Sequence, residues 1–371
     1  MAQTVRFALH GKLGGCILLR ESVGAKAKGF SCIQGLGEMT KHTVLIAVPR
    51  PLRDMILTKE ALAKLCGFAE VTLNEDGRNW TAEEIRDRLP GVEALITGWG
   101  IAKLDEATLS KADRLRIIAH AAGSVKFFVT EAVFKRGIVV THAAARIADS
   151  VAEFTLLMAL MGLRRPHELD REMKAGLWPR SQERALYEIA GKRVGLLGLG
   201  YVGRRVAKLF QAVGAKVWAY DPYISPQRAA ELGVHLTGLD ELLQGCQIIS
   251  VHLPITEETH HLLGARELAL IPDGAIFINT ARSWVVDQEA MIAELAKGRF
   301  WAALDVFDVE PLPAEHPLRR MDNVFLTPHT AGYTRDCYSS LMALVIDELE
   351  RYFKGEPLRY QVTQEMLATM A

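Results

Sequence analysis

Residues 198–203 read Gly198-Leu199-Gly200-Tyr201-Val202-Gly203 and directly follow a short apolar run at 194–197. Apolar residues then recur at helical spacing over 201–213. A strand, a glycine-rich turn and a helix in this order form the context in which G-x-G-x-x-G indicates a dinucleotide site. The first glycine permits the tight turn, the second lets the backbone approach a pyrophosphate, and the third allows the helix to pack closely on the strand. The stretch therefore predicts a Rossmann domain.

The acidic residue Asp221 indicates which dinucleotide binds. It ends the next apolar run, at 217–220, and is followed by Pro222 and Tyr223 rather than by an arginine. Its carboxylate can accept hydrogen bonds from the ribose hydroxyls and would repel a 2′-phosphate. The N–H groups of Tyr201 and Val202, at the helix start, would face the phosphates. We therefore predict that the cofactor is NAD.

The bulk composition is that of a globular protein. The chain has 371 residues, of which 49% are hydrophobic and 24% charged, and its 44 basic residues balance 44 acidic ones. A chain of this length ordinarily forms about two domains. Zero net charge argues against a general nucleic-acid or membrane-surface partner, and leaves only a local basic patch open. No apolar run approaches the ~18 residues of a transmembrane helix.

The cysteines and histidines give no indication of a metal site. The five cysteines are odd in number and form no C-x-x-C pair, which favours a reducing, cytoplasmic location. His260 and His261 are adjacent, but neighbouring side chains diverge on a regular element and no further ligand residues accompany them. We interpret these two histidines as surface residues and predict no metal.

Short apolar runs alternate with helical patterns from residue 43 onward, which predicts an α/β fold with parallel sheets. Strands are expected near 44–48, 71, 94–97, 117–120, 138–141, 194–197, 217–220, 248–252, 275–279, 302–306 and 324–327. Helices are expected at 58–65, after a capping box formed by Thr81 and Glu84, before the strands at 117 and 138, at 201–213 and at 336–353.

Three segments depart from this alternation. A long helix at 150–163 is apolar nearly all round and is therefore expected to be buried, either within one copy of the chain or in part by a second subunit. It is expected to begin at a cap on Asp149 and to stop at Pro166. Residues 166–190 are expected to be irregular. Residues 1–40 lack a sustained period and are expected to form a poorly ordered N-terminal extension, with Met39 as an alternative start.

Three further segments end predicted strands and contain the candidate catalytic residues Arg282, Glu310 and His329. Ligands of open α/β sheets bind at these carboxyl ends. Histidine suits transfer of a hydroxyl proton because its pKa lies near neutrality, and a carboxylate on the other ring nitrogen would fix its tautomer. Arginine can bind a carboxylate through two hydrogen bonds and polarise the adjacent carbonyl. The combination predicts hydride transfer at a carbon whose neighbour is a carboxylate.

Residues 43–360 resemble the D-isomer-specific 2-hydroxyacid dehydrogenase family. The resemblance rests on the glycine turn, V-H-L-P at 251–254, N-T-A-R at 279–282 with V-D at 286–287, L-D-V-F-D-V-E-P-L at 304–312, and T-P-H-T-A-G at 327–332. It implies two Rossmann/flavodoxin-like domains, with the NAD domain (146–332) inserted into the substrate domain (41–145 and 333–371). It also implies a homodimer formed through the helix at 150–163.

The resemblance implies a role for each site residue. Arg282 would bind the substrate carboxylate, His329 would exchange the proton, and Glu310 would hold His329. Backbone N–H groups around 98–100 would bind the carboxylate in a cleft that closes between the domains, and Asp305 would lie near the nicotinamide carboxamide. The implied NAD-binding residues are Gly198, Gly200, Tyr201, Val202, Gly203, Asp221, Pro254, Thr259, Thr280, Ala281, Arg282, Asp305, His329 and Gly332.

The sequence departs from the family's pattern at several places near the substrate. Ser283 and Trp284 follow Arg282, where the family often has glycine, and would reshape the pocket. Residues 121–126, in place of the family's G-x-G-x-D-N, end on Lys126, which is either a substrate contact or a solvated lysine. Trp99 is either an aromatic wall over the substrate or a packing residue at a strand end. The candidate substrate-binding residues are Trp99, Gly100, Lys126 and Arg282.

The leading hypothesis is an NAD-dependent oxidoreductase that interconverts a small 2-oxo acid and the D-2-hydroxy acid. The substrate remains open among glyoxylate-like, hydroxypyruvate-like and bulkier 2-oxo acids. Residues 95–105 contain no arginine, which weakens the hypothesis that the substrate is a phosphoglycerate. Glu310 disfavours formate, since the related formate dehydrogenases have glutamine there. The alternative is an NADH-sensing interaction protein similar to the C-terminal-binding-protein corepressors. The chain ends soon after its last predicted helix, and this disfavours the alternative. A phosphite or phosphonate-linked oxidoreductase is a third hypothesis and would need a compact anion pocket.

Overall fold

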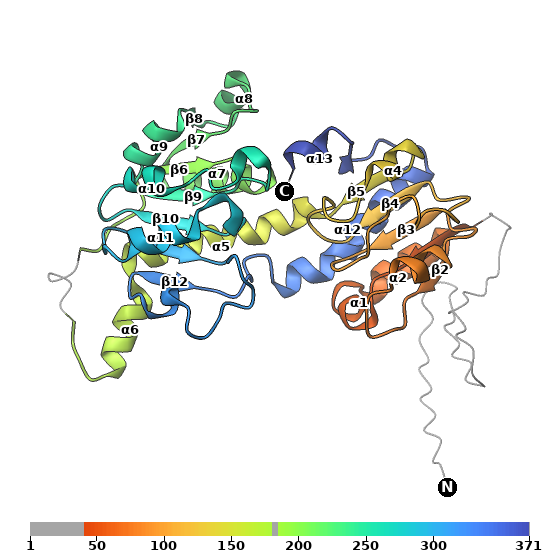
Figure 1. Cartoon of the computed structure of the whole chain (residues 1–371), viewed down its shortest axis with the longest axis horizontal. Coiled ribbons are helices and arrows are strands. Elements are labelled where there is room, and N and C mark those ends of the chain that lie inside the picture. The colour runs from red at the N-terminus through yellow and green to blue at the C-terminus, as the bar shows by residue number, and fades with distance from the viewer. Residues whose placement is uncertain (1–40, 180–184, 371) are drawn as a thin grey trace, which may run out of the picture. The chain divides into compact units, whose positions relative to one another are not determined.

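The computed structural model describes residues 41–179 and 185–370, which form two compact units (Figure 1). The first unit contains residues 41–142 and 339–363, and the second contains residues 143–338 and 364–370. The second unit is therefore inserted into the sequence of the first. The predicted N-terminal extension, residues 1–40, lies outside the described residues.

The first unit is built on a six-stranded sheet in the order β13-β5-β4-β3-β1-β2. Its strands are β1 (His42–Ile46), β2 (Ala69–Leu73), β3 (Ala94–Thr97), β4 (Ile117–His120), β5 (Val139–His142) and β13 (Gln361–Val362). All pairs are parallel except β13 with β5, so β1 to β5 have the flavodoxin-like order 2-1-3-4-5. The helices of this part are α1 (Arg50–Ile56), α2 (Lys59–Phe68), α3 (Ala82–Arg86), α4 (Glu131–Lys135) and most of α12 (Arg335–Phe353).

The second unit is built on a seven-stranded parallel sheet in the order β12-β11-β10-β9-β6-β7-β8. Its strands are β6 (Arg193–Leu197), β7 (Lys216–Tyr220), β8 (His235–Leu236), β9 (Ile248–Val251), β10 (Ile276–Asn279), β11 (Trp301–Leu304) and β12 (Val324–Leu326). Its helices are α5 (Ala144–Arg164), α6 (Pro166–Lys174), α7 (Tyr201–Ala212), α8 (Pro226–Glu231), α9 (Leu239–Gly245), α10 (Ala265–Ala269), α11 (Gln288–Leu295) and α13 (Met366–Thr369). The strand order reverses at β6, as in a Rossmann fold, so the predicted fold class is confirmed.

Alternate residues of this second sheet enter two separate cores, one on each face. Leu196 packs with Val206 and Phe210 of α7 and with residues of α5, whereas its neighbour Leu197 packs with Leu242 of α9 and residues of α10 and α11. Figure 1 shows these helices flanking the strands. The alternation follows from the two-residue period of a strand and explains why the strands read as continuous apolar runs.

The long apolar helix begins earlier than predicted. The sequence predicted a start at 150 with Asp149 as the cap, but α5 begins at Ala144 and no side chain caps it. Asp149 lies inside the helix and forms an ion pair with Arg205 of α7. The alanine-rich residues 144–148 favour a helix, and tertiary packing on α7 replaces the missing cap. Within one copy of the chain the helix is not buried all round, since Leu157 and Leu160 are 49% and 37% exposed.

The region after α5 is more regular than predicted. Residues 166–190 were expected to be irregular, yet Pro166 is the first residue of helix α6. The chain turns at Arg165, which has a φ of 47° in the left-handed region. Proline is favoured at the first helical position because its missing N–H has no partner there in any case. Pro166 thus starts a helix in addition to stopping one.

A helix predicted before β4 does not form. Residues 106–111 make turns, in which the Thr108 hydroxyl donates to the Lys103 carbonyl at 2.9 Å and Asp105 accepts from the Thr108 N–H at 2.9 Å. Such local bonds compete with helix hydrogen bonds. The capping box of Thr81 and Glu84 is confirmed at the start of α3. Among residues 41–179 and 185–370, no helix has the length and apolar character needed to span a bilayer.

Three buried histidines make the stability of the fold depend on pH. Burial lowers the pKa of His252 to about 3. Burial, and secondarily the charge of His142, lower the pKa of His120 to about 3, while a hydrogen bond to the Ser124 backbone opposes the shift. Burial also lowers the pKa of His142. Below the ordinary histidine pKa of about 6.5, the unfolded chain therefore binds more protons than the folded chain.

We expect the free energy of unfolding to be greatest above pH 6.5 and to fall as the pH drops below it. Each buried histidine contributes up to about 1.4 kcal/mol per pH unit, so a loss of about 3 kcal/mol or more is expected between pH 7 and pH 5. Urea denaturation at pH 7 and at pH 5 measures this loss in the free energy of unfolding. His252→Asn should show a shallower dependence, and equal free energies at pH 7 and pH 5 would contradict the expectation.

Candidate active site

The carboxyl edge of the second sheet gathers the residues that the sequence predicts for the site. Six of the seven strands in this sheet are followed, within a few residues, by a predicted site residue. These residues are Gly198 after β6, Asp221 after β7, Pro254 after β9, Thr280 after β10, Asp305 after β11 and His329 after β12. Because parallel strands end on the same edge, distant segments of the sequence meet there.

The turn between β6 and α7 accepts only glycine at two of its three glycine positions. Gly198 has a φ of 97°, and a Cβ on it would lie 2.8 Å from the His252 carbonyl oxygen. A Cβ on Gly203 would lie 2.0 Å from the Gly198 carbonyl oxygen. A Cβ on Gly200 would meet nothing within 4 Å. The open space at Gly200, at the amino end of α7, fits the approach of a pyrophosphate.

Two alanine substitutions separate packing from cofactor binding in this turn. We expect Gly203→Ala to lower the free energy of unfolding by about 1–3 kcal/mol, because the new Cβ overlaps backbone. We expect Gly200→Ala to leave stability nearly unchanged and to weaken NADH binding about tenfold or more, since its Cβ occupies the open space. Urea denaturation and NADH fluorescence titration measure the two effects. Equal NADH affinity in Gly200→Ala and the wild type would count against the site.

Asp221 is held rigidly at the end of β7. One carboxylate oxygen accepts from the Leu199 N–H at 2.8 Å, and the other accepts from the Tyr223 N–H at 2.9 Å. Each oxygen keeps a second lone pair, so the carboxylate can still accept from two ribose hydroxyls. The first of these bonds ties Asp221 to the glycine turn, which matches the arrangement that NAD requires.

A second loop follows β9 and includes a residue that sequence reasoning missed. The Thr259 hydroxyl donates to the Pro254 carbonyl at 2.7 Å and closes the loop. His252 lies beside the glycine turn, with its Cβ 3.7 Å from the Cβ position of Gly203. Within the described ranges neither of its ring nitrogens has a hydrogen-bond partner. The V-H-L-P motif contained this histidine, but nothing in the motif indicated that it would be buried.

The loop after β10 orients Arg282 through its own backbone. The Asn279 side chain donates to the Arg282 carbonyl at 2.9 Å and accepts from the Ala281 N–H at 3.1 Å. The hydroxyls of Thr280 and of Thr155 on α5 lie 3.2 Å apart. Asn279 and Thr155 were not predicted as site residues. An asparagine directly after a buried strand was an available indication, because its side chain readily folds back onto the following backbone.

The Arg282 guanidinium is half-buried. One of its nitrogens donates to the Ala281 carbonyl at 2.6 Å. Burial lowers the pKa of Arg282, and the negative charge of Glu310 opposes that shift. The guanidinium stays protonated because its ordinary pKa is so high. Arg282 therefore presents a fixed positive charge beside Glu310.

His329 and Glu310 form a hydrogen-bonded pair. Nδ1 of His329 lies 2.8 Å from one carboxylate oxygen of Glu310, and the other oxygen accepts from the Phe307 N–H at 3.0 Å. A carboxylate only accepts, so Nδ1 has the hydrogen and Nε2 remains for proton exchange. The His329 backbone has a φ of 54°, in the left-handed region, and its side chain is half-exposed. The structure thus brings Arg282, Glu310 and His329 together, as the sequence predicted.

Asp305 holds the loop that contains His329. Its buried carboxylate accepts from the Thr327 hydroxyl at 2.6 Å and from the N–H groups of Thr330 and Ala331 at 2.8 and 2.9 Å. These bonds anchor residues on both sides of His329. Gly332 follows at a close approach to α5, where a Cβ would lie 2.9 Å from a methyl group of Ile147.

The other candidate substrate residues lie in the first unit, after β3 and β4. Gly100 has a φ of 79°, and the Trp99 carbonyl accepts from the Asn79 side chain at 3.2 Å. The Lys126 N–H donates to the Ser124 hydroxyl at 3.3 Å. The structure therefore places Trp99, Gly100 and Lys126 at the carboxyl edge of the first sheet.

His260 and His261 do not diverge, contrary to the expectation from the sequence. Their rings stack with centroids 4.0 Å apart, and the Trp284 ring lies 4.3 Å from that of His260. The reason is local, since His261 has a φ of 48° and is not part of a regular element. In the described ranges no group of three or more histidine, cysteine or acidic residues is arranged to hold a metal ion.

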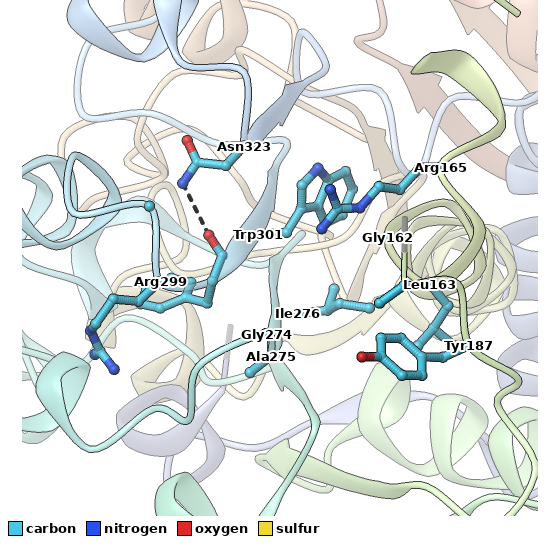
Figure 2. Close-up of a pocket in the computed structure, with 13 residues that line it drawn as sticks. Gly162, Leu163, Arg165, Tyr187, Gly274, Ala275, Ile276, Arg299, Trp301 and Asn323 are labelled. Carbon is cyan, nitrogen blue, oxygen red and sulfur yellow. Dashed lines mark hydrogen bonds between the residues drawn. The ribbon is translucent and has the colours of Figure 1, made fainter. Parts of the chain in front are cut away.

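The second unit also has a cavity of about 250 Å³, at the opposite ends of the strands from these residues. It is lined where β10 and β11 begin, by Ile276 and Trp301, and by Leu163 and Tyr187 (Figure 2). The predicted site residues follow the other ends of the same strands, and none of them lines this cavity. It is therefore separate from the candidate active site.

Comparison with known proteins agrees with this geometry. Residues 156–331 match the family model described as D-isomer specific 2-hydroxyacid dehydrogenase, NAD binding domain. A D-3-phosphoglycerate dehydrogenase of Archaeoglobus fulgidus is 36% identical over 76% of this chain and 53% of its own length. A glyoxylate reductase of Aeropyrum pernix is 35% identical over 86% of this chain and 97% of its own length.

A solved structure extends the similarity to the fold. The TT0316 protein from Thermus thermophilus has a TM-score of 0.71 and 31% identity, over 86% of this chain and 100% of its own. This chain spans about half the length of the phosphoglycerate dehydrogenases that it matches. The glycine turn and Asp221 fit NAD, the cofactor of the matching family model. The chain belongs to the D-isomer-specific 2-hydroxyacid dehydrogenase family.

Proposed function

We propose that this protein is an NAD-dependent oxidoreductase that interconverts a small 2-oxo acid and the corresponding D-2-hydroxy acid. The observation that supports this most strongly is the His329–Glu310 pair, 2.8 Å apart, beside the positive charge of Arg282. A proton donor and a carboxylate-binding cation are the two groups that reduction of a 2-oxo acid requires from the protein.

Arg282 would bind the carboxylate of the 2-oxo acid through two parallel hydrogen bonds. Its guanidinium would also polarise the adjacent carbonyl, because the developing negative charge on oxygen is then close to a fixed cation. Asn279 and Thr155 keep the backbone of this loop in place, so the guanidinium starts from a fixed position. Arg282 thus orients the substrate carbonyl.

His329 would donate a proton from Nε2 to the carbonyl oxygen during reduction and accept it from the hydroxyl during oxidation. Bound NADH supplies the hydride that the carbonyl carbon receives. Glu310 holds the opposite ring nitrogen and stabilises the protonated imidazole, and Asp305 keeps the supporting loop in place. The protein residues therefore control orientation and proton exchange.

Three further features complete the proposal. Trp99, Gly100 and Lys126 would contribute substrate contacts from the first unit. Two copies of the chain would associate through α5, whose exposed Leu157 and Leu160 give it an apolar surface. The cysteine distribution of the sequence favours the cytoplasm as the location of the enzyme.

A spectrophotometric screen tests this function. Oxidation of NADH would be followed by its near-ultraviolet absorbance with glyoxylate, hydroxypyruvate, pyruvate and bulkier 2-oxo acids, with NADPH as the comparison cofactor. We expect turnover of at least one acid and a strong preference for NADH. Absence of turnover with every acid, in a protein that still binds NADH, would contradict the proposal and favour an NADH-sensing role.

A further inference from the structure

A side-chain hydrogen bond joins the two loops that flank the glycine turn. The Tyr223 hydroxyl, in the loop after β7, donates to the carboxylate of Glu258, in the loop after β9. Strand β6 lies between β9 and β7 in the sheet, so the bond reaches from one side of the glycine turn to the other. This hydrogen bond between Tyr223 and Glu258 is termed the loop bridge.

The backbone at both ends of the loop bridge is held in place. The Tyr223 N–H donates to the Asp221 carboxylate at 2.9 Å. On the other side, Glu258 lies in a single helical turn, in which the Thr259 N–H donates to the Thr256 hydroxyl at 3.2 Å. The loop bridge therefore connects two loops whose own hydrogen bonds already fix their shape.

The stability of the fold does not account for the loop bridge. Tyr223 is 65% exposed, and Glu258 is exposed as well. Hydrogen bonds between exposed side chains contribute little to folding, because water serves both groups in the unfolded chain. The exposed ring of Tyr223 has surface available to a flat ligand, and the bond to Glu258 limits the rotation of that ring.

The cofactor of the family supplies a flat ligand at this place. With the pyrophosphate at Gly200, the adenosine ribose would lie at Asp221, which accepts from its hydroxyls. The adenine is attached to the ribose carbon next to the one that has the 2′-hydroxyl, so it would leave the ribose close to Asp221. Tyr223 is two residues further along the chain. Nucleobases stack on tyrosine rings, and this stacking strengthens binding whichever base is present.

We propose that Tyr223 is a cofactor-binding residue whose ring stacks on the adenine of NAD, and that Glu258 is a positioning residue that holds this ring through the loop bridge. The glycine turn and Asp221 recognise the pyrophosphate and the ribose, whereas the loop bridge recognises the base. Cofactor binding does not require a 2-oxo acid, so this role is independent of the proposed activity.

Binding of NADH and of its two parts tests the role of Tyr223. Fluorescence titration gives the Kd for NADH and for reduced nicotinamide mononucleotide, and calorimetry gives the Kd for ADP-ribose. We expect Tyr223→Ala to raise the Kd for NADH and for ADP-ribose about tenfold. Tyr223→Phe keeps the ring without the hydroxyl and should raise both values about threefold. The Kd for reduced nicotinamide mononucleotide, which has no adenine, should not change.

Variants of Glu258 test the loop bridge itself. Glu258→Ala removes the acceptor and should raise the Kd for NADH about threefold, whereas Glu258→Gln keeps an acceptor and should bind NADH like the wild type. The double variant Tyr223→Phe with Glu258→Ala should also lose about threefold, since both changes remove the same bond. Glu257→Ala removes the neighbouring exposed carboxylate and serves as the control, with an unchanged Kd.

The results that would overturn these roles are distinct. NADH affinity in Tyr223→Ala equal to or greater than that of the wild type would exclude stacking on the adenine. A loss in Glu258→Gln as large as in Glu258→Ala, or a double variant weaker than either single variant, would exclude the positioning role of Glu258. Equal losses for ADP-ribose and for reduced nicotinamide mononucleotide would show a general disturbance of the edge and would exclude both roles.

Discussion

Replacing His329 by alanine is expected to lower kcat about 10³-fold while the dissociation constant for NADH changes little. His329 is the group with a free ring nitrogen beside Arg282, so its loss removes proton exchange at the carbonyl oxygen. NADH binding depends mainly on the glycine turn and Asp221, which the substitution leaves intact. Steady-state kinetics and NADH fluorescence titration on the same preparation measure the two quantities.

Two other variants control this result. Glu310→Gln keeps the size of the side chain but not its charge, and we expect it to lower kcat about 10- to 100-fold, because it leaves the protonated imidazole without a counter-charge. His235→Ala removes an exposed histidine on β8, which is at the opposite edge of the sheet from β12. It should change neither kcat nor the dissociation constant for NADH. Turnover of His329→Ala within about tenfold of the wild type would contradict the assignment.

Replacing Arg282 by alanine is expected to lower kcat/KM about 10³-fold, mainly through a higher KM for the 2-oxo acid. Two charge-assisted hydrogen bonds to a carboxylate are lost, each contributing about 1.5–3 kcal/mol. Arg282→Lys retains the charge without the paired donors and should fall between the wild type and the alanine variant. Initial rates over a range of acid concentrations give both constants.

The control for Arg282 is an arginine of the same unit that takes no part in the site. Arg266 pairs with Asp240 on the surface, and Arg266→Ala should leave kcat/KM within about twofold of the wild type. The result that would contradict the role of Arg282 is an alanine variant whose KM for the acid is unchanged. A loss of NADH affinity equal to the loss of acid affinity would instead show that the whole edge had been disturbed.

Much of the fold and of this edge could be predicted from the sequence because both depend on local patterns. The glycine turn between β6 and α7 combines a required backbone conformation with a strand before it and a helix after it. Arg282, Glu310 and His329 follow buried strands, and parallel strands bring their ends together whatever the loop lengths. In these cases local sequence and overall topology agree.

The features that were not predicted depend on tertiary contacts. Asp149 has the side chain of a helix cap but pairs with Arg205, and α5 begins earlier, at Ala144, because packing on α7 supports it. In the sequence Asp305 is an acidic residue directly after a predicted strand, and only the structure shows its three hydrogen bonds to the loop that contains His329. The burial of His252 likewise depends on the turn that packs over it. Spacing along one chain does not encode such contacts.

The most direct test of the central claim is an isotope-transfer measurement. The enzyme would be incubated with NADH deuterated at C4 of the nicotinamide and with a 2-oxo acid identified by the screen, and the product would be examined by mass spectrometry and chiral chromatography. The account predicts the D-2-hydroxy acid with deuterium at C2. A product of L configuration, or deuterium absent from C2, would contradict it.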